Sequence, residues 1–447
     1  MAIANTSIGR FINGTENTLI VIFMSIFAII LGNCFNFMSW AYIFQMRYYV
    51  LIAFICYAMY FLFMVQLRNK YIPFKYYVLF LTVWPISCHI SSIIFGGTLS
   101  EDLLSSLPWL FVSTLFIIFH RFHFTERRIL IILGIVAIGT VGIQIMQLVE
   151  PLFTVFGDPT GETLGELVVS GERNGIVRLF VGCIPLQMLM LFLFWCKFMT
   201  TFRIHWALLT GLMLFSVYMY LTKQVLIATV FTLGLSFFML QGRRIKIIAY
   251  TMMVILTAIL AFFWEDLFGD MIKDSQDDSF SHAIRFEFIG FISEYFITHP
   301  IESIFGHGFS IPLIKEWIHK LYHLSDIGFF GEAFSYGWPW SIAYFLVVFR
   351  ILVTYRNRIP LYIRLYVIAT GFISIFIFPY RNRIEMYTWI SAIYICSLYI
   401  SDAVEEKKNT EDNDSETTPH QEIEIQEALV QETVQNEDIN NNTNIQE

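Results

Sequence analysis

The stretch ILIILGIVAIGTVGIQIMQLV, residues 129–149, decides the fold class. It carries no charged side chain, and about 20 apolar helical residues suffice to cross the hydrocarbon core of a bilayer. Hydrophobic residues make up 56% of the 447 and charged residues only 14%, whereas a soluble domain has roughly 25% charged residues. Stretches of this kind recur along the chain, so the sequence predicts a polytopic membrane protein.

Further apolar segments of similar length lie on both sides of this stretch. We expect about twelve transmembrane helices in an all-α architecture that occupies residues 1–400. The longest polar interruption, 265–332, would separate the ninth and tenth spans, and it is large enough for an extracytoplasmic cap of short amphipathic helices. The expected spans lie near 18–38, 49–67, 76–97, 106–120, 129–149, 176–196, 204–221, 224–241, 245–264, 333–353, 362–380 and 384–400.

The distribution of basic residues predicts the orientation of these spans. With a cytoplasmic N-terminus, the inner segments hold sixteen Lys and Arg residues against two acids, while the outer segments hold ten against twenty. Basic residues concentrate on the cytoplasmic side of membrane proteins. We therefore expect both the N-terminus and the C-terminus to be cytoplasmic.

Residues 401–447 form a separate acidic tail. They carry fourteen Asp and Glu residues, two lysines and few aromatic or β-branched residues. Such a composition cannot bury enough apolar surface to order itself, so we expect a disordered cytoplasmic tail. The tail also accounts for the net charge of −8, because the remainder of the chain is net positive.

Within the expected cap, apolar residues recur at helical spacing over 284–296. His282 and Arg285 stand three residues apart and would share one face of that helix. Pro300 should end the helix, because proline cannot continue one. The histidine of FGHGF, residues 305–309, lies between two glycines and indicates a tight turn.

Ten cations interrupt the acidic outer segments and are the residues most informative about function. Ionisable groups at span ends are costly, so the default hypothesis for them is a functional role. Arg178 would lie a few residues inside the sixth span, and Lys223 in a very short turn before the eighth. Arginine binds phosphate through several hydrogen bonds, so the set indicates an anionic ligand at the outer face, unless the cations pair with nearby glutamates or lipid phosphates. The set is Arg47, Arg173, Arg178, Lys223, Lys273, Arg285, Lys315, Lys320, Arg381 and Arg383.

Four motifs resemble those of the O-antigen polymerase and ligase superfamily, which includes the Wzy-type polysaccharide polymerases. GERNGIVRLF (171–180) is similar to a segment with Arg and Gly that leads into a span, and YLTKQVLIATVF (220–231) to a Thr-x-Ser-Arg-Gly span start. IRFEFIGFISEYFITHPIESIFGHGF (284–309) resembles the family's order of arginine, aromatic helix, Asn/His-Pro and Gly-x-Gly. SDIGFFGEAFSYGWPW (325–340) resembles the segment entering the tenth span, where Asp326 is typical of the polymerases and His of the ligases.

The resemblance implies a GT-C-like membrane fold and a metal-independent glycosyltransferase that uses no cofactor. Such an enzyme transfers a glycan from undecaprenyl pyrophosphate onto the newest lipid-linked repeat unit. It would thereby polymerise O-antigen, capsule or exopolysaccharide at the outer face of the bacterial inner membrane. The implied partners are the undecaprenyl-pyrophosphate-linked oligosaccharide, membrane lipids and a chain-length regulator, and no nucleic acid.

The resemblance and the chemistry together suggest roles for individual residues. Arg285 would stabilise the charge that develops on the pyrophosphate leaving group, and Asp326 would accept the proton of the acceptor hydroxyl. Glu332 is a further catalytic candidate. The pyrophosphate would be bound by Arg173, Arg178, Lys223, Arg285, Arg381 and Arg383, and the secondary candidates are His282, His307 and His323.

Two other functions fit parts of the sequence. A ligase that moves glycan onto lipid A core or onto protein would be expected to carry His rather than Asp near position 326. A flippase or transporter for lipid-linked sugars would show internal repeats and a polar cavity at the midplane, whereas here the polar residues concentrate in one outer segment. His319 and His323 have metal-compatible spacing, but no third ligand stands at a defined distance along the chain, so no metal site is predicted.

Overall fold

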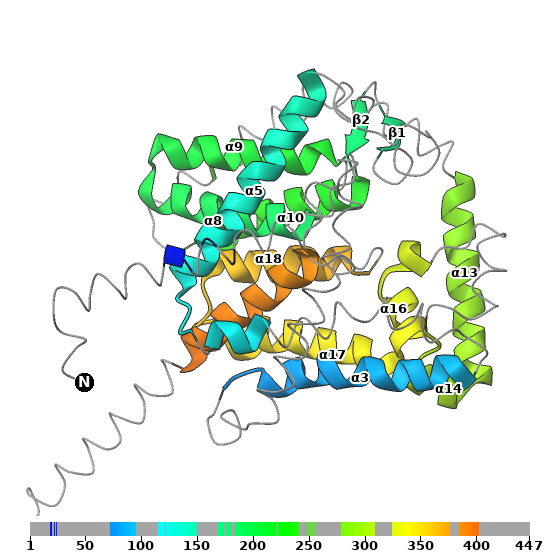
Figure 1. Cartoon of the computed structure of the whole chain (residues 1–447). Coiled ribbons are helices and arrows are strands. Elements are labelled where there is room, and N and C mark those ends of the chain that lie inside the picture. The colour runs from blue at the N-terminus through cyan, green and yellow to red at the C-terminus, as the bar shows by residue number, and fades with distance from the viewer. Residues whose placement is uncertain are drawn as a thin grey trace, which may run out of the picture. The chain divides into compact units, whose positions relative to one another are not determined.

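The computed structural model is drawn in Figure 1. The chain divides into two units, Met1–Ser397 and Leu398–Glu447. Predictions about Arg381, Arg383, His323 and the acidic tail beyond residue 401 lie outside the described residues. Apart from single positions near 18–24 and 247–254, the described residues are 72–94, 115–120, 122–149, 169–173, 176–179, 184–220, 222–240, 279–308, 324–375 and 384–401.

Helices form nearly all of the described structure. Besides the α-helices there are a 3-10 turn η3 (Leu324–Ile327), a π turn η4 (Arg350–Thr354) and further helical residues at 115–120 and 384–401. The α-helices are α3 (Lys75–Ile94), α5 (Glu126–Val149), α8 (Ile184–Thr201), α9 (Ile204–Met219), α10 (Lys223–Met239), α13 (Ser279–Thr298), α14 (Pro300–Phe305), α16 (Gly328–Tyr336), α17 (Trp338–Phe349) and α18 (Leu361–Ile373).

Three of the described helices, α3, α5 and α8, are long and apolar enough to cross a membrane. The helices α9, α10, α17 with its π turn, and α18 are apolar but shorter. These lengths and compositions support a helical membrane protein. The count of twelve spans and their orientation stay predictions.

The apolar helices pack into a bundle in which α8 is central. Helix α8 contacts α9, α18 and α5, and α18 also contacts α10 (Figure 1). A helix that is apolar on every side is stable only when it is buried or faces lipid. Helix α8 is the buried case, with Met188, Leu191 and Phe192 inaccessible, whereas α5 exposes Ile131, Ile135 and Ile138 along one side, as a lipid-facing helix would.

Several polar side chains inside the bundle bond to one partner each. Gln144 on α5 and Ser216 on α9 share a side-chain hydrogen bond of 2.5 Å, and Trp195 Nε1 donates to Ser236 Oγ at 2.8 Å. Others bond to the carbonyl one turn earlier in their own helix, which leaves the helix surface apolar. The threonines of this kind are Thr140, Thr210, Thr229, Thr370 and Thr388.

Helix ends that were predicted to be cytoplasmic lie together. The Tyr362 hydroxyl, at the start of α18, donates to Glu126 Oε1 at the start of α5 over 2.6 Å. The ring of Phe74, next to the start of α3, lies edge-on to Tyr355, next to the end of η4, with centroids 6.2 Å apart. This grouping is compatible with the predicted alternation of the spans.

A two-stranded antiparallel sheet departs from the all-α prediction. Strand β1 (Val169–Arg173) pairs with β2 (Ile176–Leu179), and Arg173 lies opposite Ile176. Only Asn174 and Gly175 connect the strands, and Asn-Gly is the preferred pair for a two-residue hairpin connection. Residues 176–179 therefore lie in the hairpin and not in a span as predicted, and the apolar helix that follows, α8, begins at Ile184.

The predicted tenth span, 333–353, is also broken. Helix α16 ends at Tyr336 and α17 starts at Trp338, because Gly337 between them has a φ of 83°. That conformation is readily available only to glycine, and Pro339 then favours a new helix start. The break gives the backbone a sharp turn at the point where two other segments approach it.

Candidate functional site

Helix α13 carries Arg285, and one stripe of this helix is buried. Phe288, Ile292 and Phe296 recur at intervals of four residues and are almost inaccessible, so they face the protein. Arg285 precedes Phe288 by three residues and continues the same stripe, and it is half-buried. The expected helix and its end before Pro300 are confirmed, since α13 stops at Thr298.

The buried stripe of α13 packs against the segment that carries Asp326 and Glu332. Phe288, Ile292 and Phe296 form one apolar cluster with residues of η3 and α16, namely Ile327, Ala333 and Phe334. Asp326 is the residue before Ile327 in η3, and the side chain of Glu332, only 2% exposed, is next to Ala333 in α16. The fold therefore brings the helix of Arg285 against the elements of both predicted catalytic acids, although the Asp326 side chain itself lies outside the described residues.

The turn after α14 locks onto the end of α16 through backbone contacts. His307 N–H donates to the Phe334 carbonyl at 2.9 Å, and Gly308 N–H to the Ser335 carbonyl at 3.0 Å. Gly306 and Gly308 have φ values of 78° and 73°, which confirms the tight turn expected around the histidine. A Cβ on Gly306 would lie 2.5 Å from the Ser335 oxygen, so only glycine permits this approach.

Helix α3 contacts the end of α16 from the other side and so completes the junction between the turn at 306–308, α16 and α3. The Trp84 indole N–H donates to the Tyr336 carbonyl at 2.6 Å, and the Cys88 thiol approaches that oxygen at 3.4 Å. The Trp84 ring also stacks at 12° on Phe305 of α14, with centroids 6.2 Å apart. Tyr336 is the last residue of α16, so its carbonyl is one that the helix itself leaves unsatisfied.

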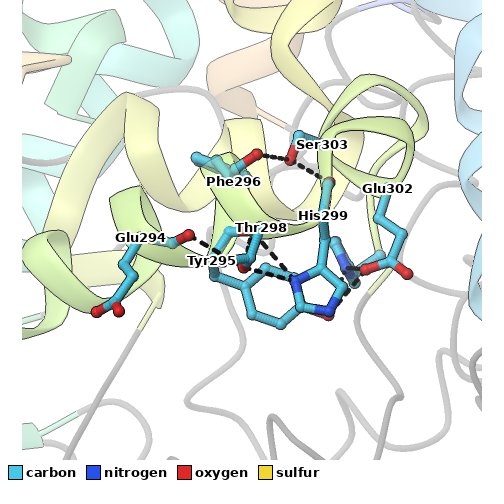
Figure 2. Close-up of polar contacts among 8 residues, drawn as sticks. Glu294, Tyr295, Phe296, Thr298, His299, Glu302 and Ser303 are labelled. Atoms are coloured by element: carbon cyan, nitrogen blue, oxygen red, sulfur yellow. Dashed lines mark hydrogen bonds and ion pairs between the residues drawn. The ribbon is translucent and has the colours of Figure 1, made fainter.

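A polar cluster joins α13, α14 and the glycine turn (Figure 2). The Tyr295 hydroxyl donates to Glu302 Oε2 at 3.0 Å, and His307 Nε2 lies 3.2 Å from both that carboxylate oxygen and the tyrosine hydroxyl. Three side chains from three successive segments thus meet at one carboxylate oxygen. We call α13, α14 and the turn at 306–308 the α13–α14 corner.

The environment of His307 favours its neutral form. The ring is fully buried and stacks on Phe334 with centroids 4.4 Å apart and planes inclined by 8°. Burial lowers the pKa of His307, and the hydrogen bond to Glu302 opposes this only in part. Burial, with a smaller contribution from Glu302, raises the pKa of Tyr295, so the phenol keeps its proton and acts as a donor.

A pair of stacked rings lies on the outside of the corner. The His299 imidazole stacks on Tyr295 at 12°, with centroids 4.3 Å apart. Its Nδ1 is 2.8 Å from the Thr298 hydroxyl and 3.3 Å from the Tyr295 carbonyl, which holds the ring in place (Figure 2). His299 itself is exposed. The corner therefore presents a flat aromatic surface beside a carboxylate.

The remaining predicted residues are spread over other elements. Arg173 and Arg178 lie in the β-hairpin, so Arg178 precedes α8 and is not inside a span as expected. Lys223 is the first residue of α10, and His282 lies in α13 one turn before Arg285. The side chains of these four residues lie outside the described part, so their contribution to a phosphate site stays a prediction.

Sequence reasoning missed Tyr295, His299 and Glu302. A tyrosine seven residues before a glutamate, with a His-Pro pair between them, gives no sign that a corner will bring the two together. His307 was noted as a turn residue, but its contact with Glu302 requires the fold. Among the described residues, no group of three His, Cys, Asp or Glu side chains has the arrangement of a metal site.

Comparison of the chain with family models, with curated proteins and with solved structures gives no match. The motifs in the sequence and the geometry of the corner are the features that indicate a function.

Proposed function

We propose that this chain is a membrane-embedded glycosyltransferase that polymerises undecaprenyl-pyrophosphate-linked repeat units at the outer face of the bacterial inner membrane. One observation carries the proposal. The two stretches that resemble polymerase motifs, 284–309 and 325–340, pack into a single unit although fifteen residues separate them along the chain. Arg285 belongs to the buried stripe through which this packing occurs.

The proposed reaction needs a cation, a proton acceptor and no further chemistry from the protein. The acceptor hydroxyl oxygen bonds to the anomeric carbon of the donor glycan while the bond from that carbon to the pyrophosphate breaks. The pyrophosphate leaves with the electron pair, and Arg285 stabilises its developing negative charge. The hydroxyl proton passes to a carboxylate, for which Asp326 is the first candidate and Glu332 the second.

The arrangement of the bundle is compatible with the proposed alternation of the spans. The starts of α5 and α18, and the start of α3 and the end of η4, meet in pairs that the predicted topology assigns to the cytoplasmic side. The opposite ends then face outward, and with them α13 and the loop that contains it. In this orientation the acidic residues after 401 form a cytoplasmic tail.

Deletion of the gene tests the reaction class. A polymerase deletion should leave a surface glycan of one repeat unit, as seen by gel electrophoresis of the extracted polysaccharide. Complete loss of surface polymer with accumulation of full-length lipid-linked chains would indicate a ligase. Loss of all lipid-linked repeat units from the outer leaflet would indicate a flippase, and either result would refute the proposal.

Substitution of Arg285 tests the site. Arg285→Ala should abolish chain elongation while the amount of protein and the single-repeat glycan stay at wild-type level. Arg203→Ala, an exposed arginine before α9 on the predicted cytoplasmic side, provides the control and should elongate normally. Polymer of normal length in the Arg285→Ala strain would remove the proposed role of this residue.

A further inference from the structure

The Glu302 carboxylate is bonded on one oxygen only. Both of its hydrogen-bonding neighbours, Tyr295 and His307, contact Oε2. No residue in the described part of the chain bonds to Oε1, and the side chain is 21% exposed. A carboxylate has about four lone-pair positions, so Glu302 can still accept at least one hydrogen bond from an external donor.

The bonded oxygen is rigidly held. His307 is fully buried and stacked on Phe334, and Tyr295 keeps its proton because burial raises the pKa of its hydroxyl. The two donors fix the direction of the second oxygen, which is the arrangement found where a polar group orients a ligand.

The stacked rings of Tyr295 and His299 lie beside this carboxylate. The His299 ring is exposed and stacks on Tyr295, whose hydroxyl bonds Glu302, so the outer ring of the stacked pair offers a flat surface. A sugar presents a flat face of C–H groups together with hydroxyl donors along its edge. An aromatic surface next to a fixed carboxylate is complementary to that shape and chemistry.

This surface lies several helical turns along α13 from Arg285. Tyr295 follows Arg285 by ten residues, which corresponds to about 15 Å along a helix. A pyrophosphate held by Arg285 would therefore lie well away from Glu302. The carboxylate is placed to contact the glycan at a distance from the bond that reacts.

We propose that Glu302 and the stacked rings of Tyr295 and His299 form a glycan-binding subsite of the enzyme, with His307 as a positioning residue. This inference rests on the proposed function. A hydroxyl of the oligosaccharide donates to Glu302 Oε1, and one sugar ring packs on the aromatic pair. The subsite therefore contributes to substrate binding and to specificity and takes no part in bond cleavage.

Steady-state kinetics of the full-length protein in nanodiscs distinguishes a role in substrate binding from a role as proton acceptor and from a purely stabilising role. The substrate is the lipid-linked repeat unit extracted from the deletion strain. Glu302→Gln should raise KM about tenfold and leave kcat within about twofold, because a charge-assisted hydrogen bond made throughout the reaction is lost. Tyr295→Phe, which keeps the ring but releases the carboxylate, should raise KM by a smaller factor.

The control is Glu294→Gln. Glu294 is exposed on α13, and its carboxylate points away from the cluster (Figure 2), so its KM should equal that of the wild type. A fall in kcat of more than about tenfold at unchanged KM in Glu302→Gln would identify Glu302 as the proton acceptor and overturn the subsite. A lower unfolding temperature with both constants unchanged would show that the cluster only stabilises the corner, and would also overturn it.

Failure of the proposed function gives a different result. If the wild-type protein does not elongate the lipid-linked unit and Arg285→Ala behaves identically, the polymerase assignment fails. Saturation-transfer NMR with the free repeat-unit oligosaccharide and the full-length protein then tests the subsite by itself. Transfer to the sugar protons in the wild type, and its loss in Glu302→Gln, supports the subsite, whereas equal transfer in both refutes it.

Discussion

The helical bundle and the α13–α14 corner use polar side chains in opposite ways. In the bundle, five threonines return their hydroxyls to a carbonyl of their own helix, and the pairs Gln144–Ser216 and Trp195–Ser236 join two helices at a time. In the corner, Tyr295, Glu302 and His307 from three segments meet at one oxygen. Each single pair stabilises the contact of two helices, whereas the convergent set in the corner leaves Glu302 Oε1 without a partner among the described residues.

The backbone differs between the two regions as well. Gly139, Gly142 and Gly211 in the bundle have open space where a Cβ would be, and their helices tolerate one. Gly306 in the corner and Gly337 between α16 and α17 have positive φ, and a Cβ on either would lie within 2.7 Å of backbone atoms of another segment. These three bundle glycines therefore accept a Cβ, whereas the two turn positions permit only glycine. Four substitutions test this contrast.

The largest effect is expected for Gly337→Ala. The new Cβ would meet the Ile304 carbonyl oxygen, and alanine at a φ of 83° is strained by about 1–2 kcal/mol before any clash is counted. We expect a destabilisation of more than about 3 kcal/mol, seen as loss of the monodisperse protein peak in detergent. Gly290→Ala, in α13 with nothing near the new methyl group, should leave the peak intact. Equal elution peaks for the two variants would contradict the close backbone contact between Gly337 and Ile304.

A smaller effect is expected for Trp84→Phe. This change removes the 2.6 Å hydrogen bond to the Tyr336 carbonyl and leaves only the weaker Cys88 thiol contact, at a cost of about 1–3 kcal/mol. Trp195→Phe in the bundle is the matched comparison, because Ser236 keeps a hydrogen bond to the Leu233 carbonyl after the indole is lost. Thermal unfolding should show the larger decrease for Trp84→Phe. The reverse order would mean that α3 does not fasten the junction.

The pH dependence of stability should report on His307. Burial lowers its pKa in the folded protein, so the unfolded chain binds the proton more readily. The contribution of the neutral ring is complete above the ordinary histidine pKa of about 6.5 and is lost as the pH falls through the lower folded value. The groups that face His307 are Glu302, Tyr295 and His299. The unfolding temperature should therefore fall more between about pH 7.5 and 5.5 in the wild type than in His307→Gln, and parallel curves would contradict the buried neutral ring.

The smallest effect is expected for Ser216→Ala in the bundle. Hydrogen bonds between membrane helices contribute about 0.6 kcal/mol on average, so the loss of the contact with Gln144 should cost about that much. Reversible unfolding in mixed micelles would measure it. A cost as large as that of Trp84→Phe would show that a single polar pair in the bundle stabilises the protein as much as the bond between α3 and α16, and the contrast would fail.

Long apolar runs in the sequence predicted the positions of several helices well. Expected spans at 129–149, 204–221 and 362–380 start within three residues of α5, α9 and α18, because a charged or proline residue precedes each apolar run. The end of α13 before Pro300 was predicted for the same kind of reason. The local sequence is therefore sufficient to predict a helix boundary where a residue type such as proline permits only one backbone conformation.

The sequence predictions were wrong or incomplete where the local structure depends on neighbouring or distant residues. The run from 176 is apolar enough for a helix, but Asn-Gly before it favours a hairpin, and that signal was overlooked. Gly337 was counted as part of a span because an isolated glycine is often tolerated in helices. The positive φ there depends on the approach of Ile304 and Gly306, which are distant in sequence. The Glu302 cluster could not be predicted, since it depends on the angle at which α14 leaves α13.

The bond between Trp84 and Tyr336 has a consequence for biosynthesis. Its partners are 252 residues apart, so α3 enters the membrane long before the carbonyl that its indole will bind has been synthesised. The contacts between the turn at 306–308 and α16 become possible at the same stage of synthesis, but they close a much shorter loop and cost less chain entropy. We therefore expect the local contacts to form first, so that a formed corner docks onto a helix that is already inserted in the bilayer.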